Sequence, residues 1–385
     1  MLAVLHVAHS HQVSEGKIER LRDDAGLRIH LVRSTRTPDR LDGTLRVPVW
    51  RRADPHRCLY GTLAFGLRRF HPDIVHVEEE PDSLAALQVA LARRRWARRT
   101  RLVYHTWQNV RRELGPGARA LLALTLRSAD AILCASREAE RVWRSLGFTG
   151  LTRTILPQGV DVSSFAPPPA PPPPGRFSVG YVGRLAAEKG CATLLDAVAA
   201  LEPPAELTLV GDGPERRALE VRAGALGLAG RVRFTGTLSH ESLPGVFAGF
   251  DVVVLPSRTT AVWKEQFGRV LAEAMACAVS VVGSDSGAIP DVIGDAGLVF
   301  PEGDAAALAQ RLRTLRESPA LRRQLGRRGR ERAVAEFSEA TLARQTAAFY
   351  RELAGKERGG PRTEGGTDSG GWKAKDGTEG AGGVS

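Results

Sequence analysis

Residues 265–276 read EQFGRVLAEAMA, with two carboxylates eight positions apart, at Glu265 and Glu273. The apolar spacing after Gly268 predicts a helix, and the first backbone N–H groups of a helix have no acceptor inside it and favour an anion. Glu265 then stands at the helix mouth, with Glu273 about two turns further along the same side. Phosphates facing the N–H groups and hydroxyls facing the carboxylates would suit a sugar nucleotide. The alternative is an ordinary helix start with a solvated glutamate.

The composition is typical of a globular protein of two domains. The chain has 385 residues, of which 43% are hydrophobic and 25% are charged, and one core does not ordinarily grow to this length. No apolar run approaches the roughly 20 residues that span a bilayer. The first residues read as a strand without a basic leader, which predicts a cytoplasmic protein. Four scattered cysteines predict reduced, buried thiols.

The net charge of +11 points to an anionic partner or to a solvated basic surface. Much of the charge is arginine, as in residues 93–99, RRRWARR. The simplest interpretation is a solvated helix end, and contact with an anionic membrane surface or an acceptor phosphate stays open. Aromatic residues do not alternate with the basic ones as they do in single-strand binders, so we expect no nucleic acid partner.

Short apolar runs alternate with helical patterns through both halves of the chain, which predicts an α/β fold of two doubly wound parallel sheets. One predicted helix covers His56–Phe70. The predicted strands are Leu2–Ala8, Arg28–Arg33, Leu45–Trp50, Ile74–Glu78, Arg101–Trp107, Ala131–Ala135 and Arg153–Leu156 in the first half, and Ser178–Val182, Leu207–Val210, Arg231–Phe234, Val252–Leu255, Val279–Val282 and Leu298–Phe300 in the second.

A run of prolines marks the boundary between the halves, because proline favours an extended spacer and cannot join a sheet interior. We therefore expect a first domain over 1–165, a linker over 166–175 and a second domain over 176–338. A final helix follows over 339–355. The tail, 356–385, is rich in glycine and charge and is expected to be disordered.

Several loops of the second half follow predicted strands, where open α/β sheets bind ligands. Gly183 lets the backbone approach a ligand closely, and Arg184 and Lys189 on the same loop can both reach a diphosphate. Gly211 ends the next strand in a glycine-rich turn, and Thr237-Leu238 follows the one after it. Each signal is weak alone, but in this order they converge on one crevice.

The ordered set of motifs over residues 176–340 resembles the family 4 retaining glycosyltransferases of the GT-B fold. The set comprises GRL…KG at 183–190, GDGP at 211–214, FTG at 234–236, the Glu265/Glu273 stretch and GAIPDVI at 287–293. In the first half the resemblance is weaker and rests on residues 76–81, 106–109 and 157–161. It implies two Rossmann-like domains facing across a cleft, with the acceptor mainly on the first and the nucleotide-sugar on the second. The final helix would pack back toward the first domain.

The resemblance also implies roles for individual residues. Arg184 and Lys189 would hold the donor diphosphate, Glu273 the ribose hydroxyls, and Glu265 the donor sugar's hydroxyls. The implied donor-binding set is Gly183, Arg184, Lys189, Gly211, Thr237, Leu238, Glu265, Phe267, Gly268 and Glu273. The catalytic candidates are Glu265, Arg184, Lys189 and His105. No metal or other cofactor is implied, because the two cations and the helix terminus would neutralise the leaving diphosphate.

The sequence departs from the family's pattern mainly in its first half. The glycine pair that usually follows the first strand is missing from residues 9–16, and Gln108 stands where the family has a histidine. His105 lies three positions earlier and is equally suited to a structural role in the core. In the second half, Ala278 and Ser280 replace the usual Gly and Pro, and Ser286 replaces one glycine of a pair.

The predicted function is transfer of a sugar, with retention of configuration, from a nucleotide-sugar to a glycan, lipid-linked or small-molecule acceptor. Polysaccharide or glycoconjugate biosynthesis is the expected setting. A catalytically degenerate nucleotide-sugar-binding protein and a sugar-nucleotide epimerase of the same fold are the alternatives. The sequence identifies neither the sugar, the base nor the acceptor.

Overall fold

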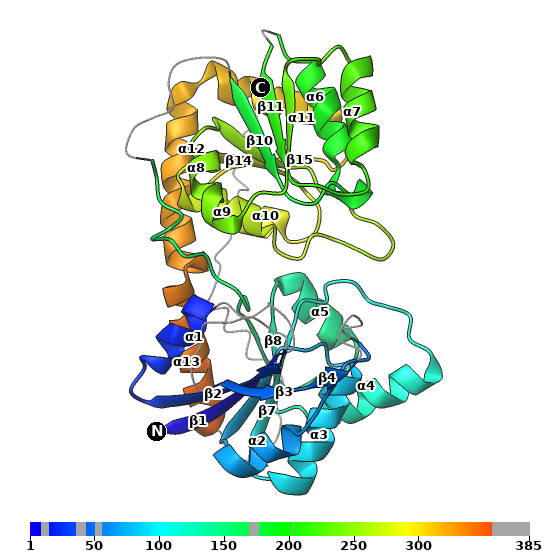
Figure 1. Ribbon diagram of the computed structural model, residues 1–385, viewed down its shortest axis with the longest axis vertical. Coiled ribbons are helices and arrows are strands. Elements are labelled where there is room, and N and C mark those ends of the chain that lie inside the picture. The colour runs from blue at the N-terminus through cyan, green and yellow to red at the C-terminus, as the bar shows by residue number, and fades with distance from the viewer. Residues whose placement is uncertain (9–14, 36–43, 51–55, 169–176, 203, 356–385) are drawn as a thin grey trace, which may run out of the picture.

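The computed structural model describes residues 1–8, 15–35, 44–50, 56–168, 177–202 and 204–355, which form two parallel sheets, each covered by helices (Figure 1). The first sheet has the order β3-β2-β1-β6-β7-β8-β9. Its strands are β1 (Leu2–Val7), β2 (Leu27–Ser34), β3 (Thr44–Val47), β6 (Ile74–Val77), β7 (Arg101–Thr106), β8 (Ala131–Cys134) and β9 (Leu151–Thr154).

The second sheet has the order β12-β11-β10-β13-β14-β15, and all its pairs are parallel. Its strands are β10 (Ser178–Val182), β11 (Glu206–Val210), β12 (Val232–Gly236), β13 (Val252–Leu255), β14 (Ser280–Ser284) and β15 (Leu298–Phe300). In each sheet the winding direction reverses beside the first strand, between β1 and β6 and between β10 and β13. The doubly wound α/β prediction is confirmed, and these reversals are where such sheets bind ligands.

The helices of the first domain lie on both faces of its sheet. They are α1 (Glu15–Arg22), α2 (Leu63–Phe70), α3 (Leu84–Trp96), α4 (Pro116–Ser128) and α5 (Arg137–Ser145). The later helices are α6 (Cys191–Ala199), α7 (Arg216–Ala225), α8 (Leu243–Phe247), α9 (Arg269–Ala276), α10 (Ile289–Ile293), α11 (Ala305–Glu317), α12 (Pro319–Arg332) and α13 (Glu339–Gly355), with short turns η1 (Ala187–Lys189) and η2 (His240–Ser242) and a π-helical turn η3 (Ala333–Phe337).

Two predictions in the first domain are wrong in detail. The helix expected from His56 begins only at Leu63, because Leu59–Tyr60 forms β5, an antiparallel pair with β4 (Val49–Trp50). The backbone N–H of Tyr60 donates to the Gln88 side chain, which is a partner that a helix would not supply. The strand expected over 45–50 is divided into β3 and β4 at Pro48, which has no N–H to donate to a ladder.

Helix α13 returns from the second domain to the first (Figure 1) and packs against α1. An ion pair joins Arg351 to Asp24 at 2.5 Å, and Arg153 Nη2 lies 3.1 Å from both carboxylate oxygens of Glu352. The expected linker lies partly, and the expected tail wholly, outside the described residues. In the part of the chain that the structure describes, no helix has the length and apolar character needed to cross a membrane. All four cysteines are free and buried, as predicted.

Candidate functional site

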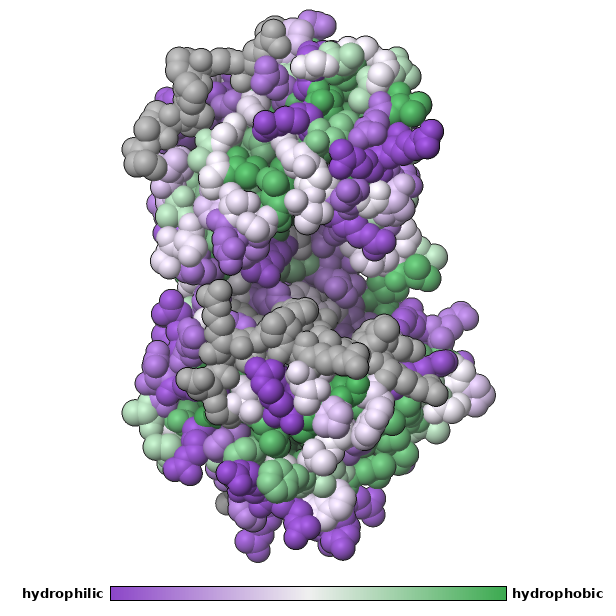
Figure 2. Space-filling view, viewed as in Figure 1, coloured by the Kyte–Doolittle hydropathy of each residue, from purple (hydrophilic) through white to green (hydrophobic). Residues whose placement is uncertain are grey.

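The carboxyl ends of the two sheets face each other (Figure 1). Figure 2 shows a recess between the domains in which hydrophilic residues predominate. Glu265 lies on this side of the second sheet, between β13 and α9, with 7% of its surface exposed. Its Oε2 accepts hydrogen bonds from Lys189 Nζ and from Ser257 Oγ, each at 2.7 Å. Lys189 Nζ also lies 4.6 Å from the centroid of the Trp263 ring, a favourable cation–π distance. The structure therefore brings two predicted site residues, Glu265 and Lys189, into direct contact.

Gly268 supplies the turn into α9, which begins at the next residue, Arg269. Gly268 has φ +74° and is the N-cap residue, a conformation in which a side chain would be strained. The Phe267 ring is buried and packs edge-on against Phe337, with centroids 5.5 Å apart. The first turn of α9 thus leaves backbone N–H groups for a ligand, whereas the Phe267 side chain belongs to the core.

The glycines of the site are required by close approach between backbone segments. A Cβ on Gly287 would lie 2.1 Å from the Glu265 carbonyl oxygen, and one on Gly211 would lie 1.9 Å from the Gly183 carbonyl oxygen. The neighbouring Ala288 N–H donates to the Glu265 carbonyl at 3.0 Å. Gly183 and Gly211, predicted as points of ligand approach, thus also pack against each other at the ends of adjacent strands.

Glu273 lies one turn into α9, is 4% exposed, and has partners of its own. Its Oε1 accepts from Arg269 Nε at 2.7 Å and from His240 Nε2 at 2.8 Å. Neither of these partners of Glu273 is predicted from the sequence. Arg269 stands four positions before Glu273 on one helix, a spacing that favours an ion pair, and so could have been found.

Three further predicted donor residues lie at the surface. Thr237 and Leu238 are exposed and lie shortly before η2, which begins at His240. Arg184 is also exposed, and its carbonyl accepts from Tyr181 Oη at 2.7 Å. Within the described residues, the Arg184 guanidinium makes no ion pair, so its charge is available to an anion.

The loop after β7 carries first-domain residues to the Glu265 segment. The Asn109 side chain donates to the Glu265 carbonyl at 3.0 Å, and the Gln266 side chain donates to the Trp107 carbonyl at 3.1 Å. Gln108, at the position where the family has a histidine, accepts from Arg112 at 3.1 Å. Sequence reasoning noticed residues 106–109 only through the family resemblance and did not foresee these contacts.

His105 lies beneath this loop in a buried chain of hydrogen bonds. His105 Nε2 is 2.7 Å from the Ile155 carbonyl, and His105 Nδ1 is 3.1 Å from His76 Nε2. Tyr350 Oη then joins His76 Nδ1, at 2.6 Å, to His6 Nε2, at 2.5 Å. Burial lowers the pKa of all three histidines well below the usual value, so the rings are neutral. Both ring nitrogens of His105 are occupied, and its catalytic role remains a prediction.

The Ile155 carbonyl at one end of this series of hydrogen bonds fixes which atom donates in each of them. A carbonyl only accepts, so His105 Nε2 carries a proton and His76 Nε2 must donate to His105 Nδ1. Tyr350 then donates to His76, and His6 donates to Tyr350, which leaves His6 Nδ1 as an acceptor 3.9 Å from the Glu78 carboxylate. Burial raises the pKa of Glu78 to about 7.

His6, His76 and Glu78 form the one group in the described part of the chain that has the spacing of metal ligands. Both nitrogens of His76 are already bonded. Burial lowers the pKa of His6, and the nearby charges of Lys17 and Arg33 lower it further. The same two charges oppose a further cation. The residues therefore fit a metal ion poorly.

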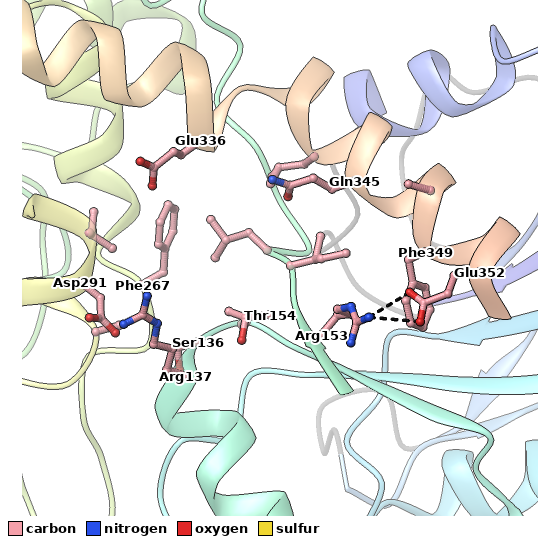
Figure 3. Close-up of a pocket in the computed structure, with 17 residues that line it drawn as sticks. Ser136, Arg137, Arg153, Thr154, Phe267, Asp291, Glu336, Gln345, Phe349 and Glu352 are labelled. Atoms are coloured by element: carbon pink, nitrogen blue, oxygen red, sulfur yellow. Dashed lines mark hydrogen bonds and ion pairs between the residues drawn. The ribbon is translucent and has the colours of Figure 1, made fainter. Parts of the chain in front are cut away.

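A cavity of about 250 Å³ lies behind Phe267, between the two domains and the C-terminal helices (Figure 3). Phe267, Asp291 and Glu336 stand at one end, and Arg153, paired with Glu352, stands near the other. Apart from Phe267, no predicted site residue lines this cavity. The cavity therefore shares only Phe267 with the predicted donor-binding set.

Comparison with known proteins identifies both halves of the chain. The model of the glycosyl transferases group 1 matches residues 165–332, and that of Glycosyltransferase Family 4 matches residues 18–164. A 2-deoxystreptamine N-acetyl-D-glucosaminyltransferase of Streptomyces fradiae is 38% identical over 193 residues, which are 46% of this chain and 44% of that protein. A 2-deoxystreptamine glucosyltransferase of Streptomyces kanamyceticus is 30% identical over 272 residues, 66% of this chain and 69% of that protein. The chain thus spans less than half of the first relative and about two thirds of the second.

Solved structures show the same fold at lower identity. Sucrose-phosphate synthase from Thermosynechococcus elongatus has a TM-score of 0.69 and 23% identity, covering 92% of this chain and 99% of that one. The Anabaena protein HepE, solved with UDP and glucose, has a TM-score of 0.69 and 21% identity, covering 91% and 100%. The predicted GT-B arrangement of two Rossmann-like domains is confirmed. The chain belongs to glycosyltransferase family 4, among the glycosyl transferases group 1.

Proposed function

We propose that the protein is a retaining glycosyltransferase that moves a sugar from a nucleotide-sugar, bound to the second domain, to an acceptor held mainly by the first. The observation that carries this proposal is the Glu265–Lys189 contact beside the start of α9 and the uncommitted Arg184. A carboxylate, two cations and a helix N-terminus then share one edge of the sheet. This combination suits a ligand with both hydroxyls and a diphosphate.

In this proposal the leaving diphosphate is neutralised by Arg184, Lys189 and the first turn of α9. Charge that develops on the leaving oxygen would be stabilised by groups that are already in place. Lys189 would exchange Glu265 for a phosphate while keeping its contact with Trp263. Glu265 would then be free to accept from a sugar hydroxyl, with Ser257 still holding its Oε2.

Glu273 is proposed to bind the ribose through its second oxygen, because Oε1 already accepts from Arg269 and His240. Thr237 and Leu238 precede His240 and would flank the base. We propose that the attacking acceptor hydroxyl loses its proton to the leaving phosphate on the same face of the sugar. No step in this scheme calls for a metal ion.

The acceptor is proposed to be a glycan, a lipid-linked sugar or a small molecule. The Streptomyces relatives are named for 2-deoxystreptamine, which supports a small polyhydroxylated acceptor. Cytoplasmic location, contact with an anionic membrane through the basic surface, and the absence of a nucleic acid partner remain predictions. A degenerate nucleotide-sugar binder and an epimerase stay as alternatives that turnover assays decide.

The test is a panel of UDP-, GDP- and dTDP-sugars scored first by thermal shift and then by release of the nucleoside diphosphate. A ligand at 100 times its Kd stabilises the folded state by about 2.7 kcal/mol, so a true donor raises the melting temperature measurably. We expect turnover of the same donor with EDTA present. Binding without turnover for any acceptor would favour the degenerate binder, and no binding at all would refute the proposal.

A further inference from the structure

We propose that Asn109 is a positioning residue for the transfer reaction and that it aligns Glu265 when the two domains close. This inference rests on the proposed function of Glu265. The Asn109 side chain donates a hydrogen bond to the backbone carbonyl of Glu265 and not to its carboxylate. It therefore acts through Glu265.

Three consecutive residues of the second domain reach across to the first. Lys264 Nζ lies 3.3 Å from Glu138 Oε1 on α5, the Glu265 carbonyl accepts from Asn109 at 3.0 Å, and the Gln266 side chain donates to the Trp107 carbonyl at 3.1 Å. We call these three contacts the clasp. Because they lie at and on both sides of Glu265, closure of the domains fixes that segment from the first domain as well as from the second.

The loop after β7, which carries Trp107 and Asn109, is held in place by hydrogen bonds within the first domain. Glu80 accepts from the Trp107 N–H at 2.9 Å and from the Thr106 hydroxyl. The same hydroxyl oxygen accepts from the Trp143 indole at 3.0 Å and from the Gln108 N–H at 3.1 Å. Thr106 and Trp143 are fully buried. The loop therefore presents Asn109 from a fixed base, which is what a positioning group requires.

The hydrogen bond between Asn109 and the Glu265 carbonyl can form and break at little energetic cost. The Glu265 carbonyl also accepts from the Ala288 N–H at 3.0 Å, within its own domain. When the domains separate, this carbonyl keeps one partner and is not left buried and unpaired, which is the expensive outcome. Closure of the domains thus adds a hydrogen bond, and their separation leaves no buried carbonyl without a partner.

The residue type at position 109 fits this function closely. Asn109 is 6% exposed and is the only asparagine among the 385 residues. The carbonyl that it faces needs a donor, and a short neutral amide supplies one. An aspartate of the same size would set an acceptor against an acceptor at neutral pH.

The experiment compares Asn109→Ala and Asn109→Asp with wild type in donor turnover and in calorimetric binding of UDP, or of the diphosphate that the donor panel selects. We expect kcat to fall at least tenfold in Asn109→Ala, with Kd for the diphosphate within twofold of wild type. The activity of Asn109→Asp relative to wild type should rise as the pH falls from 8 to 5, because a protonated carboxyl donates. Gln310→Ala, which removes an exposed amide on α11, is the matched control and should behave as wild type.

A second readout does not depend on turnover. Amide hydrogen exchange over residues 264–268 should be faster in Asn109→Ala than in wild type, and Gln266→Ala should reproduce the effect if the first variant fails to fold. Unchanged exchange, or faster exchange with unchanged kcat, would overturn the proposal. If wild type turns over no donor, the proposed function fails, whereas the exchange measurement still decides whether the clasp holds this segment.

Discussion

Replacing Gly287 by alanine tests how closely the Glu265 segment must be placed. The new Cβ would lie 2.1 Å from the Glu265 carbonyl oxygen and 2.9 Å from its nitrogen, and both atoms belong to backbone. Since an ordinary contact begins near 3.4 Å, the segment must move by about 1 Å, and a misplacement of that size costs roughly 100-fold in rate. We therefore expect kcat for donor turnover to fall about 100-fold.

A matched glycine separates this displacement from backbone strain. Gly287 has φ +56° and Gly227 has φ +68°, but a Cβ on Gly227 would meet no atom within 4 Å. Both alanine variants should lose roughly 1–2 kcal/mol of stability from the left-handed conformation, measured by urea unfolding, and only Gly287→Ala should lose activity as well. Wild-type kcat in Gly287→Ala, or an equal loss in Gly227→Ala, would refute the reasoning.

Three further predictions follow from single contacts. Lys189→Ala should raise Kd for the nucleoside diphosphate at least tenfold in calorimetry, because a charge-assisted contact is lost; an unchanged Kd would remove Lys189 from the diphosphate site. Tyr350→Phe should cost about 1–3 kcal/mol in urea unfolding, because His76 Nδ1 loses its donor inside the core; a cost below about 0.5 kcal/mol would contradict the hydrogen-bond chain. Burial raises the pKa of Glu80 from 4.5 to about 7, so wild type should lose stability relative to Glu80→Gln as the pH rises from 4.5 through 7, by about 3 kcal/mol at most. Parallel stability curves of the two proteins over that pH range would show that Glu80 does not titrate there.

Much of the fold was predictable because buried parallel strands have continuous apolar sequences. The strands at Val252–Leu255 and Leu298–Phe300 have the predicted bounds. The errors lie where tertiary contacts decide. Tyr60 forms a strand because Gln88 and Glu79 offer it partners, and α10 is a five-residue helix too short to show a period.

The candidate site was predictable in its residue types and less so in its partners. The glycines, cations and carboxylates were proposed because their chemistry is visible in the sequence, and their roles remain predictions. Their pairing was not visible, since Lys189 lies 76 residues from Glu265 and Asn109 lies 156 residues away. His105 illustrates the opposite case, because a histidine in a motif gives no sign of whether its ring faces a cleft or a buried carbonyl.

The most direct test of the account is Glu265→Ala, assayed for turnover of the best donor of the panel and for calorimetric binding of the matching nucleoside diphosphate. Glu265 is assigned to the donor sugar, whereas the diphosphate is assigned to Arg184, Lys189 and the start of α9. We predict that turnover falls below detection while Kd for the diphosphate stays within a few-fold of wild type. Turnover at the wild-type rate in this variant would contradict the central role given to Glu265.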